Sequence, residues 1–123
     1  MPSQDRVNAF VETVREGRYV QAIEDFYAEA ATMRENLGPV RGGRDTLVKH
    51  EQAVLAGLKT MKTRHADLVA IDGDSVVINW VFEMTGGDGK LRRMDELALQ
   101  TWVDDQIVEE QFYYDPGQLA AAV

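Results

Sequence analysis

Five side chains that can hold or release a proton are the candidates for chemistry in this sequence. Burying a carboxylate in apolar surroundings disfavours its charged form and raises its pKa toward the range useful for general acid–base catalysis. A histidine beside a carboxylate can form a proton-transfer pair, or the two can pair only for structure. Such residues predict acid–base chemistry on a small molecule if the fold gathers them in one apolar pocket. They are Glu35, His65, Asp95, Glu110 and Tyr114.

The spacing of apolar residues predicts the elements that would position these side chains. Apolar residues recur at helical spacing in three segments, at residues 4–16, 19–28 and 45–59. A short alternating segment at residues 31–36 predicts a strand that carries Glu35. From residue 62 the period changes to two, and Asp-Gly and Gly-rich turns separate the apolar runs. Four further strands are therefore predicted, at residues 62–71, 75–85, 91–103 and 107–114.

This order of elements predicts an α+β fold with three N-terminal helices packed on a four-to-five-stranded antiparallel sheet. The helices must cover one face, because a sheet this apolar cannot leave both faces in water. With 123 residues and 13.8 kDa, the chain can bury one core and is expected to form one domain over residues 1–123. Its core would span about residues 4–116, followed by a terminal tail at 117–123.

The turns predict which side chains share the inner face of the sheet. A two-residue Asp-Gly turn after the first long strand places His65 opposite Trp80. A two-residue Gly-Asp turn after the second places Trp80 opposite Asp95, and the last hairpin brings Asp95 near Tyr114. A slip of one residue would move a strand's side chains to the other face. On this register the ligand-contact candidates are Trp80, Phe82, Leu97, Leu99, Glu110 and Phe112.

Other residues are expected around this face rather than on it. His50, on the third helix, is expected near the mouth of the pocket. The outer face would carry Trp102 and Tyr113 among polar residues, as is typical of a dimer surface with a polar rim. No ligand spacing of a known metal site is present, so neither a metal nor another cofactor is predicted.

Composition excludes several classes of partner. The net charge of −8 disfavours nucleic acids, whose binding proteins need a positive surface. The chain has no cysteine, so disulfides and thiolate sites are excluded. No apolar run approaches 18 residues and the N-terminal residues lack the order of a signal peptide, so no membrane interaction and a cytoplasmic location are expected.

The sequence resembles the SnoaL-like branch of the nuclear transport factor 2-like superfamily, to which ketosteroid isomerases and polyketide cyclases also belong. The resemblance covers residues 5–116 and is carried by FYAEAATMRENLGPVRGG, AIDGDSVVINWVFE, DELALQTW and IVEEQFYYDP. It implies a cystatin-like cone, in which a curved sheet wraps around the helices and encloses a pocket. It also implies a homodimer through the outer face of the sheet, and it is specific for the fold rather than for an activity.

The resemblance also assigns roles to residues. Glu35 matches the position of the catalytic base of ketosteroid isomerases. Those enzymes hold an oxyanion with a tyrosine and a protonated aspartate, whose positions fall on Phe10 and on or beside Leu97 here. Loss of one such donor raises the barrier by roughly 3 kcal/mol, so steroid isomerisation itself is not expected.

Three functions remain open from the sequence. The first is a cofactor-independent acid–base enzyme (an isomerase, cyclase or dehydratase) acting on an apolar small molecule. Glu35 would be its base, with Asp95, His65 and Tyr114 as acid or orienting groups. The second is a non-catalytic protein that binds or carries such a molecule. The third is a dimerisation scaffold whose cone is filled by its own side chains.

Overall fold

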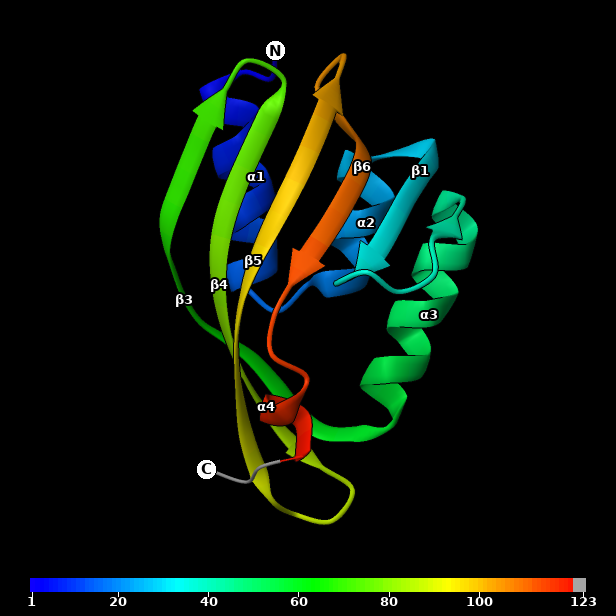
Figure 1. Cartoon of the computed structure of the whole chain (residues 1–123), viewed down its shortest axis with the longest axis vertical. Helices are drawn as coiled ribbons and strands as arrows, with labels where there is room; N and C mark the ends of the chain where they lie inside the picture. The colour runs from blue at the N-terminus through cyan, green and yellow to red at the C-terminus, as the bar shows by residue number, and fades with distance from the viewer. Residues whose placement is uncertain (121–123) are drawn as a thin grey trace.

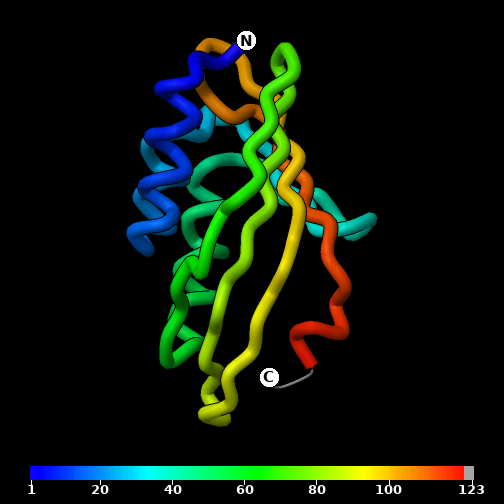
Figure 2. The backbone as a smooth tube through the Cα atoms, turned by 90° about the vertical axis from the view of Figure 1, so that its left-hand side faces the viewer, coloured from blue at the N-terminus to red at the C-terminus, as the bar shows by residue number. Residues whose placement is uncertain are grey.

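The computed structural model describes residues 1–120 as helices packed on one face of a curved, six-stranded sheet. Figure 1 shows the elements, and Figure 2 shows the three helices within residues 4–56 gathered on one side of the sheet. The strand order is β2-β1-β6-β5-β4-β3. The elements are α1 (Gln4–Arg15), α2 (Tyr19–Phe26), β1 (Tyr27–Glu35), β2 (Arg41–Gly42), α3 (Arg44–Ala56), β3 (Leu58–Asp72), β4 (Ser75–Gly86), β5 (Leu91–Val103), β6 (Gln106–Tyr113) and α4 (Gly117–Ala120).

The α+β class and the cystatin-like arrangement are confirmed, with differences in the strands. β1 is longer than expected. The sheet has six strands because the two-residue β2 pairs with β1 as an additional strand. β1 also runs parallel to β6, whereas the remaining neighbours are antiparallel. Of the expected tail, residues 117–120 form the single turn α4, and residues 121–123 lie outside the described part of the chain.

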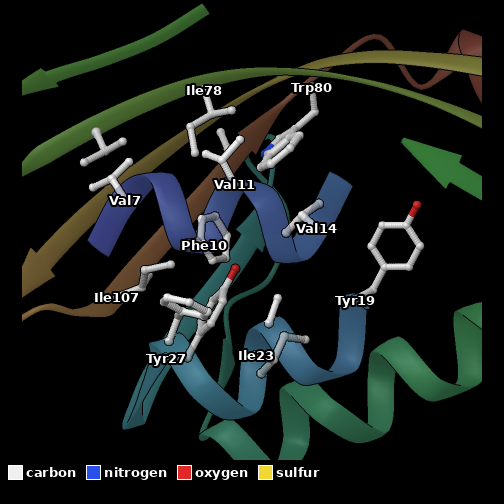
Figure 3. Packing of buried hydrophobic residues seen from close by; sticks show 14 of the residues in the cluster. Val7, Phe10, Val11, Val14, Tyr19, Ile23, Tyr27, Ile78, Trp80 and Ile107 are labelled. Atoms are coloured by element: carbon white, nitrogen blue, oxygen red, sulfur yellow. The ribbon is translucent and has the colours of Figure 1, made fainter. Parts of the chain in front are cut away.

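Helix α1 supplies the centre of the core. Its N-terminus is capped by the Ser3 side chain, which accepts a hydrogen bond from the Arg6 amide at 3.1 Å. The apolar side of the helix is buried against the sheet and α2. In Figure 3, Phe10 points from α1 toward Tyr27, and the two ring centroids lie 6.1 Å apart in an edge-to-face arrangement.

The β4–β5 hairpin decides which side chains of β5 face the helices. Its loop has three residues between Gly86 and Lys90, and the Gly86 amide donates to the Lys90 carbonyl at 3.1 Å. Gly89 has a φ of 79°, the left-handed conformation that closes a three-residue hairpin loop. Trp80 therefore pairs with Glu96. The predicted two-residue turn, and with it the pairing of Trp80 with Asp95, is wrong.

That difference of one residue exchanges the two faces of β5. Asp95 points outward, and so do Leu97 and Leu99, which are 43% and 39% exposed, so these three predicted site residues are misplaced. Glu96, Ala98, Gln100 and Trp102 take the inner face and are buried. The expectation that Trp102 lies on an outer dimer surface is therefore wrong, because its side chain is fully buried.

His65 also lies away from the expected position. The β3–β4 turn leaves Asp72 paired with Ser75, and irregularities on both sides of His65 then pair it with Val81 rather than Trp80. The imidazole is 43% exposed, and its Nδ1 lies 3.0 Å from the Asp67 carboxylate. The predicted pairing of His65 with Asp95 is not formed.

Candidate functional site

A cavity of about 140 Å³ lies between α2, α3 and the inner face of the sheet. Its walls are mainly aromatic and thioether side chains. Trp80 and Phe82 stack with centroids 5.7 Å apart and planes inclined by 21°. An apolar concave surface with a few polar groups is the usual form of a small-molecule site. The apolar lining includes Tyr19, Met33, Met61, Trp80, Phe82, Met84, Met94 and Phe112.

Four carboxyl groups from four elements reach this cavity. They belong to Glu35 on β1, Glu51 on α3, Glu96 on β5 and Glu110 on β6. Arg41 is the single lysine or arginine among the lining residues of the described chain. The cavity is thus apolar in its walls and acidic in its polar groups.

Glu35 lies at the more open side of the cavity. Its side chain is 40% exposed, and one carboxylate oxygen is 3.6 Å from the Arg41 guanidinium. Glu35 is therefore less buried than expected, because solvent and Arg41 both reach it. It faces the cavity from the rim.

Glu96 has the opposite surroundings. Its side chain lines the cavity, the residue is 6% exposed, and no hydrogen bond within residues 1–120 involves its carboxyl group. Burial raises the pKa of Glu96 to about 8, with further contributions from the charges of Glu110, Glu35, Glu51 and Asp95. Glu96 is therefore a neutral carboxylic acid at pH 7, with its hydroxyl free to donate into the cavity.

Glu110 is held by a buried chain of hydrogen bonds. The Tyr27 hydroxyl donates to one of its oxygens, and the Gln100 amide donates to the other at 2.6 Å. The Trp102 indole donates to the Gln100 carbonyl oxygen at 2.9 Å, which fixes the amide so that its NH₂ group faces Glu110. Burial raises the pKa of Glu110 to about 7, while the two donated hydrogen bonds oppose that rise.

Three further groups complete the polar side of the site. Burial raises the pKa of Glu51, the charge of Glu35 adds to the rise, and Arg41 opposes it. His50 lines the cavity from α3, as expected. Tyr114 lies beside the lining rather than in it. Burial raises the pKa of its phenol, and the Glu35 and Glu96 carboxyl groups add to the rise.

The structure brings together six of the eleven predicted site residues in the cavity: Glu35, His50, Trp80, Phe82, Glu110 and Phe112. It places Asp95, His65, Leu97 and Leu99 elsewhere. Sequence reasoning missed Arg41, Glu51 and Glu96. The signal for Glu96 was present in the glycine at position 89, which favours the three-residue loop. Residues 1–120 contain no cluster of His, Asp and Glu arranged to hold a metal ion.

The curved sheet, the helices over one face and the open cavity between them are the features of a pocket protein with an α+β fold. The SnoaL-like domain model matches residues 7–110, and the chain belongs to that family. No curated protein matches the chain. No helix in the described residues is long and apolar enough to cross a membrane.

Solved structures show the same fold. One from Mesorhizobium loti, assigned as a SnoaL-like polyketide cyclase, is 25% identical with a TM-score of 0.78, over 93% of this chain and 100% of that chain. A Catenulispora acidiphila protein with a ketosteroid isomerase-like fold, in complex with trimethylamine, is 18% identical with a TM-score of 0.78. The match covers 94% of this chain and 89% of that chain. A Xanthomonas campestris protein with a cystatin-like fold is 16% identical with a TM-score of 0.82. The match covers 97% of this chain and 95% of that chain.

Proposed function

We propose that this SnoaL-like protein is an acid–base enzyme that moves a proton within an apolar small molecule. The observation that supports it is the contrast between two carboxyl groups on one cavity. Glu35 is solvated and faces Arg41, whereas Glu96 is buried without a partner in the described chain and holds its proton at neutral pH. Two carboxyl groups in such contrasting surroundings are the usual pair for general base and general acid catalysis.

In this proposal Glu35 removes a proton from carbon and Glu96 donates one to the acceptor atom of the same substrate. A general acid or base contributes about 10²–10⁴-fold each. Glu96 precedes Leu97 in the sequence. The resemblance places the protonated aspartate of ketosteroid isomerases on or beside Leu97. Tyr114 would orient the substrate or Glu35 from the rim, the role first expected for it. No step requires a cofactor.

The cavity also bears on the alternatives. A cone filled by its own side chains would leave no space beside Trp80, Phe82 and Phe112, but these three residues line the cavity. A carrier would need the apolar walls and not the paired carboxyl groups. Carrier and enzyme are distinguished by whether a bound molecule exchanges protons with the protein.

The test is deuterium incorporation from D₂O into two carbon acids of similar size, 2-tetralone and 1-methyl-3,4-dihydroisoquinoline, followed by proton NMR. The wild type should accelerate exchange of at least one compound about 10²-fold over acetate buffer of equal carboxylate concentration. Glu35→Gln should lower that rate at least about 50-fold, and Glu96→Gln about tenfold or more.

Glu109→Gln is the matched control, because Glu109 is the exposed neighbour of Glu110. Its exchange rate should equal that of the wild type. Binding without exchange would favour the carrier, and wild-type rates in Glu35→Gln would show that the base is another residue.

A further inference from the structure

The charge around the cavity is unbalanced. Four carboxyl groups face it, and Arg41 is the one guanidinium or ammonium among the lining residues that the structure describes. Arg41 lies 3.6 Å from Glu35, and its charge opposes the rise that burial and Glu35 cause in the pKa of Glu51. No cation of the described chain stands next to Glu96 or Glu110, since neither forms an ion pair within residues 1–120.

Within residues 1–120 neither Glu51 nor Glu96 forms a hydrogen bond or ion pair through its carboxyl group, and Glu96 is the more deeply buried of the two. Glu96 is 6% exposed and lines the cavity. Its carboxyl group forms no hydrogen bond with any donor or acceptor of the described chain. Glu110, by contrast, has both oxygens occupied by Tyr27 and Gln100. The carboxyl oxygens of Glu96 are not among the fully buried, unpartnered atoms of residues 1–120, so a ligand in the cavity can reach them and form the missing hydrogen bond or ion pair.

We propose that the substrate of this cavity carries a basic nitrogen on an apolar body, with the nitrogen against the Glu96 carboxyl group and the body against Trp80 and Phe82. The reaction part of this inference rests on the proposed acid–base function. The choice of ligand class rests on the cavity alone.

The sign of the charge that develops on the substrate decides between nitrogen and oxygen acceptors. An enolate formed when Glu35 takes the proton would move the negative charge from the rim to a position nearer Glu51 and Glu110, and like charges this close repel. A protonated nitrogen places a positive charge there instead. The carboxyl groups around Glu96 would stabilise a positive charge in the cavity. They therefore favour transfer of the Glu96 proton to a base that becomes cationic.

The reaction step balances without a further reactant. Glu96 gives its proton to the nitrogen of a C=N bond, which makes the hydrogens on the adjacent carbon more acidic. Glu35 removes one of these protons, a C=C bond forms, and the C=N bond becomes a C–N single bond. The product is the enamine tautomer. Glu35 then holds a proton that it returns to solvent at the rim, and Glu96 regains one.

The cavity walls suit a cationic ligand as well. The stacked pair of Trp80 and Phe82 offers aromatic faces, which attract cations by about 0.5–2 kcal/mol. Four methionines, Met33, Met61, Met84 and Met94, give the remaining wall a flexible and polarisable surface that adapts to different apolar bodies.

The test compares three ligands of one shape by calorimetry or NMR titration: N,N-dimethylbenzylamine, its neutral carbon analogue isobutylbenzene, and phenylacetate. The amine should bind at least tenfold more tightly than either of the others at pH 8. The charged and titratable groups that shape this pH dependence are Asp95, whose charge acts from the outer face, and, on the cavity side, Glu35, Arg41, His50, Glu51, Glu110 and Tyr114.

Because the ammonium form pairs with ionised Glu96, its affinity should fall as pH falls below about 8, by up to about tenfold per pH unit. Glu96→Gln should remove this dependence and bring the amine within about threefold of isobutylbenzene. Glu109→Gln should keep both properties. If Glu96→Gln does not fold, the ranking of the three ligands on the wild type still decides the matter.

Phenylacetate binding as tightly as the amine, an amine affinity that is flat between pH 6 and 8, or no binding of the amine at millimolar concentration would each overturn the inference. Amine binding with the expected pH dependence but without deuterium exchange into either carbon acid would support the ligand class and refute the enzymatic function.

Discussion

Glu96 should make the fold less stable as pH rises, and Glu96→Gln should remove that loss. The folded state holds the proton on Glu96 up to about pH 8, whereas a carboxyl group in the unfolded chain releases it near its ordinary value of 4.5. Between these two values the folded state binds more protons than the unfolded state. The free energy of unfolding therefore decreases with pH across this window, by about 1.4 kcal/mol per unit.

At pH 7 this decrease amounts to roughly 3 kcal/mol, because most of the window has been crossed. Glutamine has nearly the shape of the neutral acid and no proton to hold. We therefore expect Glu96→Gln to be more stable than the wild type by about 3 kcal/mol at pH 7. In a domain of this size that corresponds to a rise in Tm of roughly 10 °C. The two proteins should be equally stable near pH 4.

The measurement is urea unfolding at half-unit pH steps from 4 to 8, with Glu109→Gln as the surface control. The control should stay within about 0.5 kcal/mol of the wild type throughout. Glu110 is buried in wild type and variant alike, so the difference between them reports Glu96 together with its interaction with the Glu110 charge. A Glu96→Gln protein that is less stable at pH 7, or whose advantage does not shrink toward pH 4, would refute this account of Glu96.

Three further predictions concern the network, the outer face and the hairpin. Gln100→Leu leaves the Trp102 indole without an acceptor and removes a donor from Glu110, so it should lower stability by about 2–4 kcal/mol and raise the pKa of Glu110 in a carbon-13 NMR titration. Leu99→Glu should convert the expected dimer, built on the outer face with Tyr113, into a monomer in sedimentation at micromolar concentration. Gly89→Ala should cost about 1 kcal/mol in urea unfolding, because φ is 79° there.

Most of the fold follows from apolar spacing. The three helices, the long strands and the burial of one sheet face were predictable because a helix or strand buries its apolar side over many residues. The parallel pairing of β1 with β6 was not, because no local signal joins residues 27–35 to residues 106–113. Pairing between strands that lie far apart in the sequence depends on the packing of the whole domain. Short windows of sequence carry no information about that packing.

The site was less predictable than the fold, and β5 shows why. Trp80 and Phe82 were assigned to the correct face because β4 has one clearly apolar side. Glu110 and Phe112 were also assigned correctly, because an irregularity at Thr101 and Trp102 shifts the β5–β6 register by one residue and cancels the error in β5. For β5 both faces look similar in sequence, because Leu97 and Leu99 on one side match Ala98 and Trp102 on the other. Hydrophobicity alone therefore does not distinguish the two registers. The length of the β4–β5 loop determines which register forms.

The loop thus determines the chemistry of the cavity. With a two-residue loop, Asp95, Leu97 and Leu99 would face the helices, while Gln100 and Trp102 would lie outside. The cavity would then lose Glu96 together with the donors that hold Glu110. With the three-residue loop, the same strand brings a neutral acid to the cavity and an amide that keeps both Glu110 oxygens occupied. Gly89, which does not line the cavity, therefore helps to place Glu96 on the inner face through the loop that it closes.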